Sequence, residues 1–312
     1  MKKKLLIILA LVLTIAVTVI AAACGNGTPA QSVLFNTASK VWGKDDGREI
    51  LLFDVVRGET TIGTYEMTGE CVIDVDIALG DEKVEKARGT YFTSRLSVSE
   101  NGVDTEIVTQ SYLNTRFMVQ KSYRKTTTVK EGVTTVSEII GTYNEDDYVY
   151  VYKVNDEEKR ADEISHGDFT SSAYADNDFI YQLARLISVT GALSFDVPYY
   201  NYDVDGALSN VTMETVSATV IGTTAPSQEG EETAKGFTGM RGDFADGTGK
   251  SYFGGTIGIS LTRDFPGSGT SFICDVITSV TEDGKNTALT YPLPGRITED
   301  EITYLLKSET RE

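Results

Sequence analysis

The feature that most limits what this chain can fold into is an alternation of polar and apolar residues with a period of two. It extends over Glu49–Val154, where Thr, Val, Ile and Tyr dominate. In Cys71–Ile77, for example, the odd positions are all apolar, while the even positions include Asp74 and Asp76. Side chains alternate between the two faces of a strand, so the pattern predicts strands with one buried and one solvated face. The predicted strands of this kind are Glu49–Arg57, Thr61–Met67, Cys71–Ile77, Thr90–Ser99, Thr105–Leu113, Arg116–Arg124, Thr134–Tyr143 and Tyr148–Val154.

Turn sequences separate several of these runs. Gly58, Asn101-Gly102 and Glu131-Gly132 lie between predicted strands, at the spacing of an antiparallel meander. A second β-rich half is predicted nearer the C-terminus, with strands at Ala192–Val197, Val211–Thr223, Tyr252–Arg263 and Thr270–Val280.

The segment between the two halves has helical spacing instead. Asp176 or Asn177 can cap its start, and Gly191 follows its end, so we predict a helix over residues 176–190. Its apolar residues recur at intervals of three and four: Phe179, Ile180, Leu183, Leu186 and Ile187. Near the C-terminus, Thr298–Glu301 matches a capping box, which predicts a short closing helix.

These elements predict a mainly β fold: a strongly curved antiparallel meander, half-barrel-like, with one central helix on its concave face and a short C-terminal helix. We expect a single large β-rich domain over residues 33–312. Its two halves, 33–175 and 192–312, flank the helix at 176–190. A curved sheet covered by a helix can also leave an apolar cavity, which we expect near Phe179 and Leu183.

The N-terminal residues predict where the chain works. Three lysines precede an apolar run, Leu5–Ile20, and the small residues Ala21–Ala23 lead directly into Cys24. This order resembles a bacterial lipoprotein signal peptide, although an alanine stands three residues before the cysteine, where leucine is usual. We therefore predict that residues 1–23 are a signal peptide and that Cys24 is acylated, becoming the first residue of the mature protein.

Two alternatives for the N-terminal residues stay open: an uncleaved transmembrane anchor, and an ordinary secretory signal cut near the same alanines. All three place everything after residue 24 outside the cytoplasm. Residues 24–32 read as a short flexible tether. The expected location is therefore the cell membrane, with the body lipid-anchored, facing outside the cytoplasm and bound to the membrane through N-terminal acyl chains.

Net charge excludes one class of partner. The full chain has 28 basic and 46 acidic residues, and removal of the three leader lysines leaves 25 against 46, a net charge of −21. Such a surface repels nucleic acid and anionic lipid headgroups. It favours cations or basic partners.

Cysteine and histidine usage bears on disulfides and metals. Cys71 and Cys274 remain if Cys24 is acylated, and they form either a disulfide or two buried free thiols. His166 is the only histidine, so one chain cannot supply two or three imidazoles to a metal. We predict no metal site of that kind and no cofactor.

A calcium loop is the one candidate cation site. Asn201, Asp203, Asp205 and Ser209 fall at positions one, three, five and nine of an EF-hand-like loop. Thr212 stands at position twelve, where a bidentate glutamate is expected. The segment is therefore either a calcium site or an acidic turn between two strands.

No set of residues typical of a catalytic site stands out. Ser122 and Lys125 match the S-x-x-K motif, but three residues apart in a strand they point to opposite faces, so the amine cannot activate the hydroxyl. Asp74 and Asp76 share a predicted strand face and are the only carboxylate pair considered for hydrolysis. We expect that the protein is not an enzyme.

Two stretches resemble the DUF3108-like proteins, a family of uncharacterised extracytoplasmic β-rich domains. They are Gly47–Val55 followed by Ile62–Thr64, similar to that family's opening strand pair, and Phe179–Arg185, similar to its mid-chain helix. The resemblance implies an extracytoplasmic β-rich fold and carries over no catalytic residue. We expect a membrane-anchored binding or envelope-maintenance module whose partner is a lipid or an envelope protein. The alternatives are a lipid or lipoprotein carrier with an apolar cavity and, less favoured, a carboxylate-based hydrolase.

Overall fold

The computed structural model describes residues 42, 48–144, 147–165, 175–176, 179–190, 194–205, 208–224, 241–244, 250–251, 256–263, 271–282 and 285–311. Strands dominate this part of the chain, so the predicted mainly β class is confirmed. The predicted leader, the tether and Cys24 lie outside the described residues.

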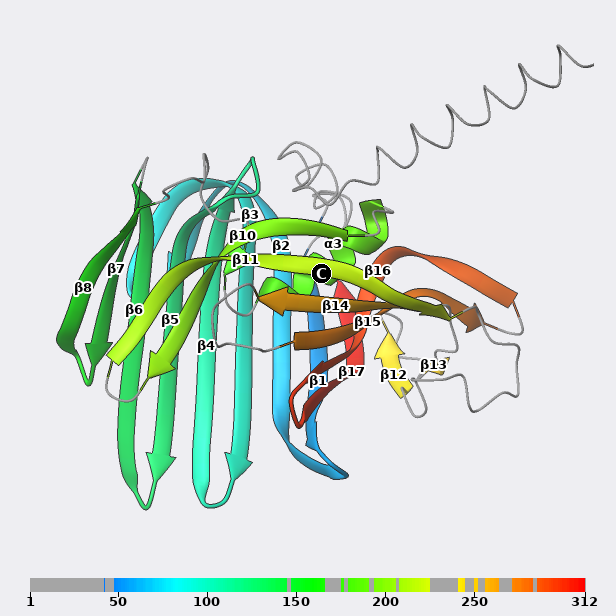
Figure 1. Cartoon of the computed structure of the whole chain (residues 1–312), viewed down its shortest axis with the longest axis horizontal. Helices are drawn as coiled ribbons and strands as arrows, with labels where there is room; N and C mark the ends of the chain where they lie inside the picture. Colours follow the sequence, from blue (N-terminus) through cyan, green and yellow to red (C-terminus); the bar gives the residue numbers. More distant parts are fainter. Residues whose placement is uncertain are drawn as a thin grey trace, which may run out of the picture.

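The first half is an antiparallel meander in which each strand pairs with the next (Figure 1). Its strands are β1 (Glu49–Arg57), β2 (Thr60–Leu79), β3 (Glu82–Glu100), β4 (Val103–Asn114), β5 (Val119–Lys130), β6 (Val133–Asn144), β7 (Asp147–Val154) and β8 (Glu157–Ser165).

The second half continues the sheet from the other side of β1. Strand β1 pairs with β17 as well as with β2, and β17 pairs in turn with β16. The elements are β9 (Ala175–Asp176), α3 (Ile180–Thr190), β10 (Ser194–Asp205), β11 (Leu208–Thr224), β12 (Arg241–Phe244), β13 (Lys250–Ser251), β14 (Thr256–Arg263), β15 (Ser271–Glu282), β16 (Lys285–Glu299) and β17 (Ile302–Arg311).

The two halves form two layers around one main core. Strands β10, β11, β14 and β15 cross in front of the long strands of the meander (Figure 1). Tyr148 of β7 stacks on Tyr200 of β10 with ring centroids 3.9 Å apart, so the layers are in contact. We call the meander face toward this core the inner face and the opposite one the outer face. The largest aromatic side chains buried in the main core include Trp42, Phe53, Phe92, Phe179 and Phe272.

Alternation explains which residues reach the core. Tyr148, Tyr150 and Tyr152 occupy one face of β7 and are all buried. Their phenol rings suit a pleated surface that is covered on one side. The period-two pattern of the sequence thus sets the inner face over most of the meander.

The tip of the β2–β3 hairpin departs from that pattern. Register shifts flank Val75, and Asp74 and Lys86 have positive φ values of 56° and 50°. The tip bends over the outer face, where the hydroxyl of Tyr91 donates to the carbonyl of Ala78 at 2.6 Å. The bend builds a second, smaller core of Val72, Ile77, Leu79, Ala87 and Tyr123.

This bend corrects the prediction for Cys71–Ile77. The odd positions were expected to be buried, but Ile73 is 51% and Val75 is 46% exposed, while Val72 is buried. A β-bulge adds a residue to one strand and shifts the side chains beyond it to the other face. Strict alternation therefore fails at the tip of the hairpin.

The helix predicted over residues 176–190 is confirmed in part: α3 covers Ile180–Thr190 and begins later than expected. Asp176 lies in β9 and pairs with Tyr200 of β10, so it does not cap the helix. Phe179 and Leu183 are buried, and the Phe179 ring lies 4.7 Å from that of Phe92. Side chains therefore fill the space at these two residues, where an apolar cavity was expected.

The predicted C-terminal helix is wrong. Strand β16 ends at Glu299 and β17 begins at Ile302, so the proposed capping box is the turn of a hairpin. Asp300 adopts a φ of 50°, a conformation that aspartate tolerates in turns. Tyr304 and Leu306 are both buried, which is the burial period of a strand.

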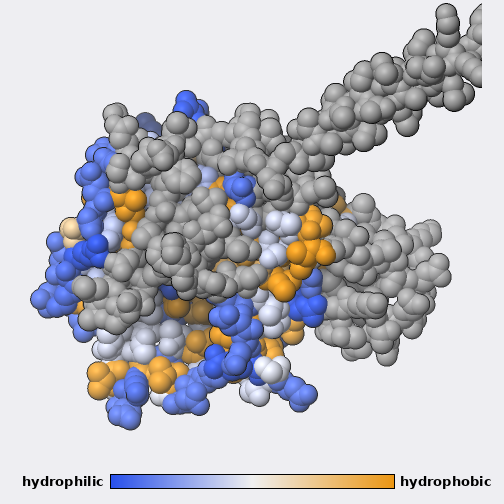
Figure 2. Space-filling view, in the orientation of Figure 1, coloured by the Kyte–Doolittle hydropathy of each residue, from blue (hydrophilic) through white to orange (hydrophobic). Residues whose placement is uncertain are grey.

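Strand β8 forms the outer border of the meander beyond β7. Six of its nine residues are charged, and this border is hydrophilic on the left of Figure 2. Charged side chains on an edge strand discourage pairing with a strand of another molecule.

Candidate functional site

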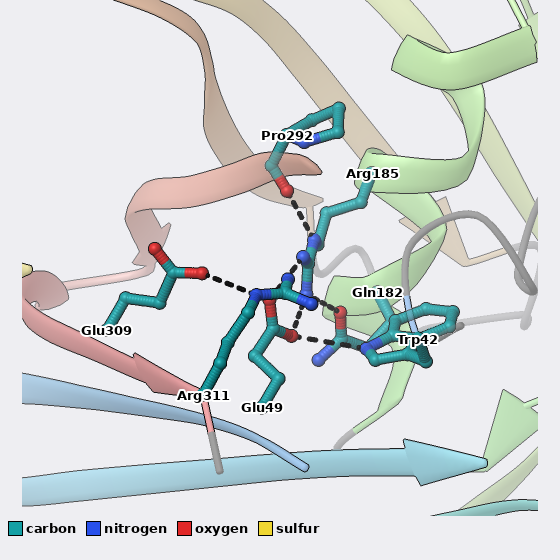
Figure 3. A network of polar contacts seen from close by, with 7 residues as sticks. All are labelled: Trp42, Glu49, Gln182, Arg185, Pro292, Glu309 and Arg311. Atoms are coloured by element: carbon teal, nitrogen blue, oxygen red, sulfur yellow. Dashed lines mark hydrogen bonds and ion pairs between the residues drawn. The ribbon is translucent and has the colours of Figure 1, made fainter. Parts of the chain in front are cut away.

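Three groups of polar side chains stand out among the described residues, and the first is a buried ion network (Figure 3). Glu49 is 1% and Arg185 is 0% exposed. Two guanidinium nitrogens of Arg185 donate to the two carboxylate oxygens of Glu49 at 2.7 and 2.8 Å. Arg311 donates to Glu49 at 2.6 Å, and the indole N–H of Trp42 donates to it at 3.2 Å. One carboxylate thus joins three segments that are far apart in the sequence.

Two further N–H groups of Arg185 also have partners. Its Nε donates to the carbonyl of Pro292 at 2.6 Å, and one terminal nitrogen donates to Gln182 at 3.0 Å. Its guanidinium also lies 5.3 Å from the ring centroid of Trp42. A buried charge needs such partners, because desolvation is costly. We therefore assign this network a structural role: it fixes α3, β1, β17 and Trp42 to one another.

The second group is a hydroxyl cluster around Asp176 on the inner face. Asp176 is fully buried and accepts hydrogen bonds from Ser111 and from Ser122, the latter at 2.6 Å. Nearby, the hydroxyls of Tyr148 and Tyr202 are 2.9 Å apart. Burial raises the pKa of both phenols, so they remain protonated at neutral pH. This cluster ties β4, β5 and β7 to β9 and β10.

The third group lines a groove on the outer face, which we call the outer-face groove. It has a volume of about 370 Å³ and crosses four neighbouring strands, β2 to β5. Its lining residues are Ile62, Gly63, Ser97, Val98, Ser99, Asp104, Thr105, Glu106, Thr127 and Val129. It opens widely to the surface and is not an enclosed cavity.

The strand register arranges the groove residues as a grid. Cross-strand pairing gives two rows over β3, β4 and β5, which are Ser99, Asp104 and Val129 in one row and Ser97, Glu106 and Thr127 in the other. Val98 packs against the main core, and side chains alternate along β3, so Ser97 and Ser99 on either side of it point to the outer face. Both rows therefore lie on the outer face. Both carboxylates therefore come from the middle strand. Glu106 has a hydroxyl residue on either side, whereas Asp104 has Ser99 on one side and Val129 on the other.

Gly63 shapes one wall of the groove. A Cβ atom there would lie 2.0 Å from the carbonyl oxygen of Ser97, so only glycine fits. Strand β2 therefore approaches β3 more closely than a side chain would permit.

The charges around the groove are unevenly paired. The hydroxyl of Ser99 donates to Asp104 at 2.5 Å, and among the described residues Asp104 has no ion-pair partner. Glu106 lies 3.5 Å from Arg95, at an exposed and therefore weak ion pair. Lys125, in the next row, lies 3.7 Å from Glu138. The groove thus holds more negative than positive charge.

The carboxylates considered for hydrolysis are engaged elsewhere. Asp74 and Asp76 lie exposed on the hairpin tip, where Arg88 donates to Asp74 at 2.6 and 2.7 Å. Lys83 lies 2.7 Å from Asp76. These hydrogen bonds lower the pKa of both carboxyls, so neither is adjusted to act as a general acid near neutral pH.

Cys71 and Cys274 are free thiols in the structure, and they do not form the disulfide that was the other alternative. Cys274 is buried in the main core on β15, and Cys71 is half-buried on β2. Burial raises the pKa of both thiols. Both therefore behave as small core residues.

The residues of the predicted calcium loop lie in a β-hairpin. Asn201, Asp203 and Asp205 belong to β10, and Ser209 belongs to β11, which pairs with it from Asp205 to Ser194. Asn201 is 1% exposed. Paired strands do not follow the loop path of an EF-hand. The backbone therefore agrees with the alternative prediction, in which this segment connects two strands. In the described part of the chain, no three His, Cys, Asp or Glu side chains are grouped to hold a metal ion.

Ser122 and Lys125 of the S-x-x-K motif point to opposite faces of β5, as predicted from the sequence. Ser122 faces the core, while Lys125 lies on the outer face beside Glu138. Sequence reasoning missed the role of Ser122 as a partner of Asp176, because the two residues are 54 positions apart. The groove did have a local signal: a two-residue turn at Asn101-Gly102 aligns Ser99 with Asp104.

Among the residues that the structure describes, none of the helices is long and apolar enough to span a bilayer. The resemblance to the DUF3108-like family stays a prediction. No protein-family model matches this chain, and no curated protein or solved structure matches it either.

Proposed function

We propose that this protein is a lipid-anchored binding module of the cell envelope that presents its outer-face groove to a partner outside the cytoplasm. The groove carries the proposal. Its volume of about 370 Å³ falls in the range of ligand sites, roughly 300 to 1,000 Å³. Its polar groups are fixed by four paired strands, which is the rigid support that a binding site needs.

The start of the body supports the tethered arrangement. Trp42 is fully buried and bonded to Glu49, so the chain is fixed to the body at residue 42. Residues 25–41 would separate it from an acylated Cys24, and an extended segment of that length spans at most about 60 Å. A body on such a tether stays close to the membrane. We infer in addition that the sheet has the strong, half-barrel-like curvature predicted from the sequence.

The carrier alternative has less support. A carrier needs an apolar cavity, but Phe179 and Leu183 of the helix region are buried, and the Phe179 ring packs against that of Phe92. The acidic surface also repels anionic headgroups.

The anchor is tested by metabolic labelling with a palmitate analogue in cells that express the full chain. We expect label on the wild type and on Cys71→Ala, and none on Cys24→Ala. Cleavage of the body by a protease added to intact cells would show that it lies outside the cytoplasm. An unlabelled wild type would contradict the lipid anchor.

The groove is tested by photo-crosslinking in the same cells. A photoreactive phenylalanine analogue replaces Thr127, which lines the groove, and in a matched variant it replaces Thr142, which is exposed and lies on the same face. We expect a crosslinked envelope protein at position 127 and none at 142. Equal crosslinking at both positions, or none at either, would refute the groove as the binding surface.

A further inference from the structure

We propose that the outer-face groove binds a primary alkylammonium group, presented by a lysine side chain of a partner polypeptide. This inference rests on the proposed function and names the ligand chemistry of the same site. The features behind it are the two carboxylates on β4, the middle strand of the grid, the hydroxyls beside them and the apolar surface between the strands.

The spacing of the carboxylates suits a cation at the groove. Asp104 and Glu106 are two residues apart on one strand, so their side chains share a face about 7 Å apart along the strand. Ser99 and Ser97 stand directly opposite them on β3. An ammonium group has three donors, and a carboxylate with a neighbouring hydroxyl supplies acceptors for them.

The existing contacts leave capacity for that cation, most of all at Asp104. In the described part of the chain, Asp104 has a hydroxyl partner but no ion pair. Arg95 reaches Glu106 at 3.5 Å, and Lys125 reaches Glu138 at 3.7 Å. These two cations border the groove at the Glu106 end, so they direct an incoming positive charge to the Asp104 end.

Apolar contacts favour an ammonium on a methylene chain over an inorganic ion. Val129 lines the groove from the Asp104 row, Ile62 lines its edge while also packing against the main core, and Thr127 adds a methyl group. Lysine places four methylenes along such a surface while its charge reaches the acceptors. Because the groove opens widely to the surface, it does not enclose a free small molecule, and a side chain held by a larger partner fits it better.

The test titrates the isotopically labelled protein, followed by NMR, with a blocked lysine peptide, with cadaverine and with 1,5-pentanediol. We expect the peptide and the diamine to shift amide signals of residues 97–106 and 127–129, the peptide at lower concentration. The diol should leave these signals in place. Raising the salt concentration should weaken both interactions, because the site is exposed.

Variants assign the binding to the carboxylates. Asp104→Asn with Glu106→Gln should weaken peptide binding by about tenfold or more. The matched control is Glu85→Gln with Glu157→Gln, which removes the same net charge at side chains that are 76% and 74% exposed. The control should bind as the wild type does.

Three outcomes would overturn the inference: no binding of either amine, equal binding to the double variant, or tighter binding of cadaverine than of the peptide. The last would show a free amine as the ligand. A failure of this inference is distinguishable from a failure of the proposed function. Crosslinking at position 127 without amine binding would leave the function standing and remove only the ligand chemistry.

Discussion

Single residues hold distant parts of this chain together. Glu49 is 1% exposed and accepts hydrogen bonds from Trp42, Arg185 and Arg311. The carboxylate and Arg185 are 136 positions apart. Without its carboxylate, the guanidinium of Arg185 would remain buried with no counter-charge, and an uncompensated buried charge is strongly destabilising.

Glu49→Gln is therefore expected to lower the free energy of unfolding by about 3 to 5 kcal/mol. The control is Asp54→Asn, which removes an ion pair to Lys307 whose side chains are 34% and 52% exposed. It should cost about 1 kcal/mol or less. Urea unfolding of the two variants measures both values, and equal losses would contradict a special role for the buried network.

Cys71 and Cys274 are expected to differ in their reactivity. Cys71 is half-buried and Cys274 is fully buried, with the pKa of both thiols raised by burial. Because the thiolate is the reactive form, iodoacetamide should modify Cys71 slowly in the native protein and Cys274 only after unfolding. Mass spectrometry of the alkylated peptides measures this. A Cys71–Cys274 disulfide in unreduced native protein would contradict it.

Among the elements, the β2–β3 hairpin departs furthest from its predicted form. Its tip lies against the outer face, where the N–H of Gly80 donates to Gln110 at 2.7 Å and Glu82 pairs with Lys121. A Cβ atom on Gly80 would lie 2.5 Å from the ring of Tyr123. The bend thus depends on a glycine with a φ of +58°.

Gly80→Ala is expected to release the tip, because alanine is strained at this φ and also collides with Tyr123. Hydrogen exchange of residues 72–87 should become faster by about tenfold or more, which corresponds to a local loss of roughly 1.4 kcal/mol. Gly58→Ala is the control, because Gly58 has a φ of +60° with no atom within 4 Å of a Cβ. Exchange at the tip should stay unchanged in that variant.

At the same scale, the sequence predicted where strands occur better than where they begin. The predicted strand Arg116–Arg124 starts too early, because the side chain of Asn114 accepts the N–H groups of Arg116 and Met118 and forms a turn there. The predicted runs Thr61–Met67 and Cys71–Ile77 form one strand, β2. Local turn chemistry and bulges thus override the alternation at strand ends.

The candidate site was less predictable than the strands. Asp104 and Glu106 alternate with Val103, Thr105 and Ile107, which indicates a solvated face but no groove. The groove exists only because β2, β4 and β5 pair with their neighbours in one register, with Gly63 allowing a close approach. Contacts such as Arg185 with Glu49 depend on the chain path, which no local pattern specifies.

Across the whole molecule, the hydroxyl cluster joins the two layers. Tyr148 of the meander and Tyr202 of the second layer share a hydrogen bond of 2.9 Å, and burial raises the pKa of both. In the unfolded chain these phenols ionise near pH 10. The unfolded state therefore binds fewer protons than the native state above that pH.

The free energy of unfolding is accordingly expected to fall as the pH rises above about 10, with the contribution of these tyrosines complete below that value. Urea unfolding at several alkaline pH values measures the slope. In Tyr148→Phe the slope should be shallower, because one group with a raised pKa is gone. An unchanged slope would show that other groups cause the alkaline loss.

The contact of Trp42 with Glu49 has a mechanical consequence. A pull that reaches Trp42 along the chain is delivered to the first residue of β1, which is paired on one side with β2 and on the other with β17. Force along a strand held on both sides loads its ladder hydrogen bonds together, in shear, and does not unzip them one by one. In the lipid-anchored form that we propose, the body would resist extraction at the residue where tension enters.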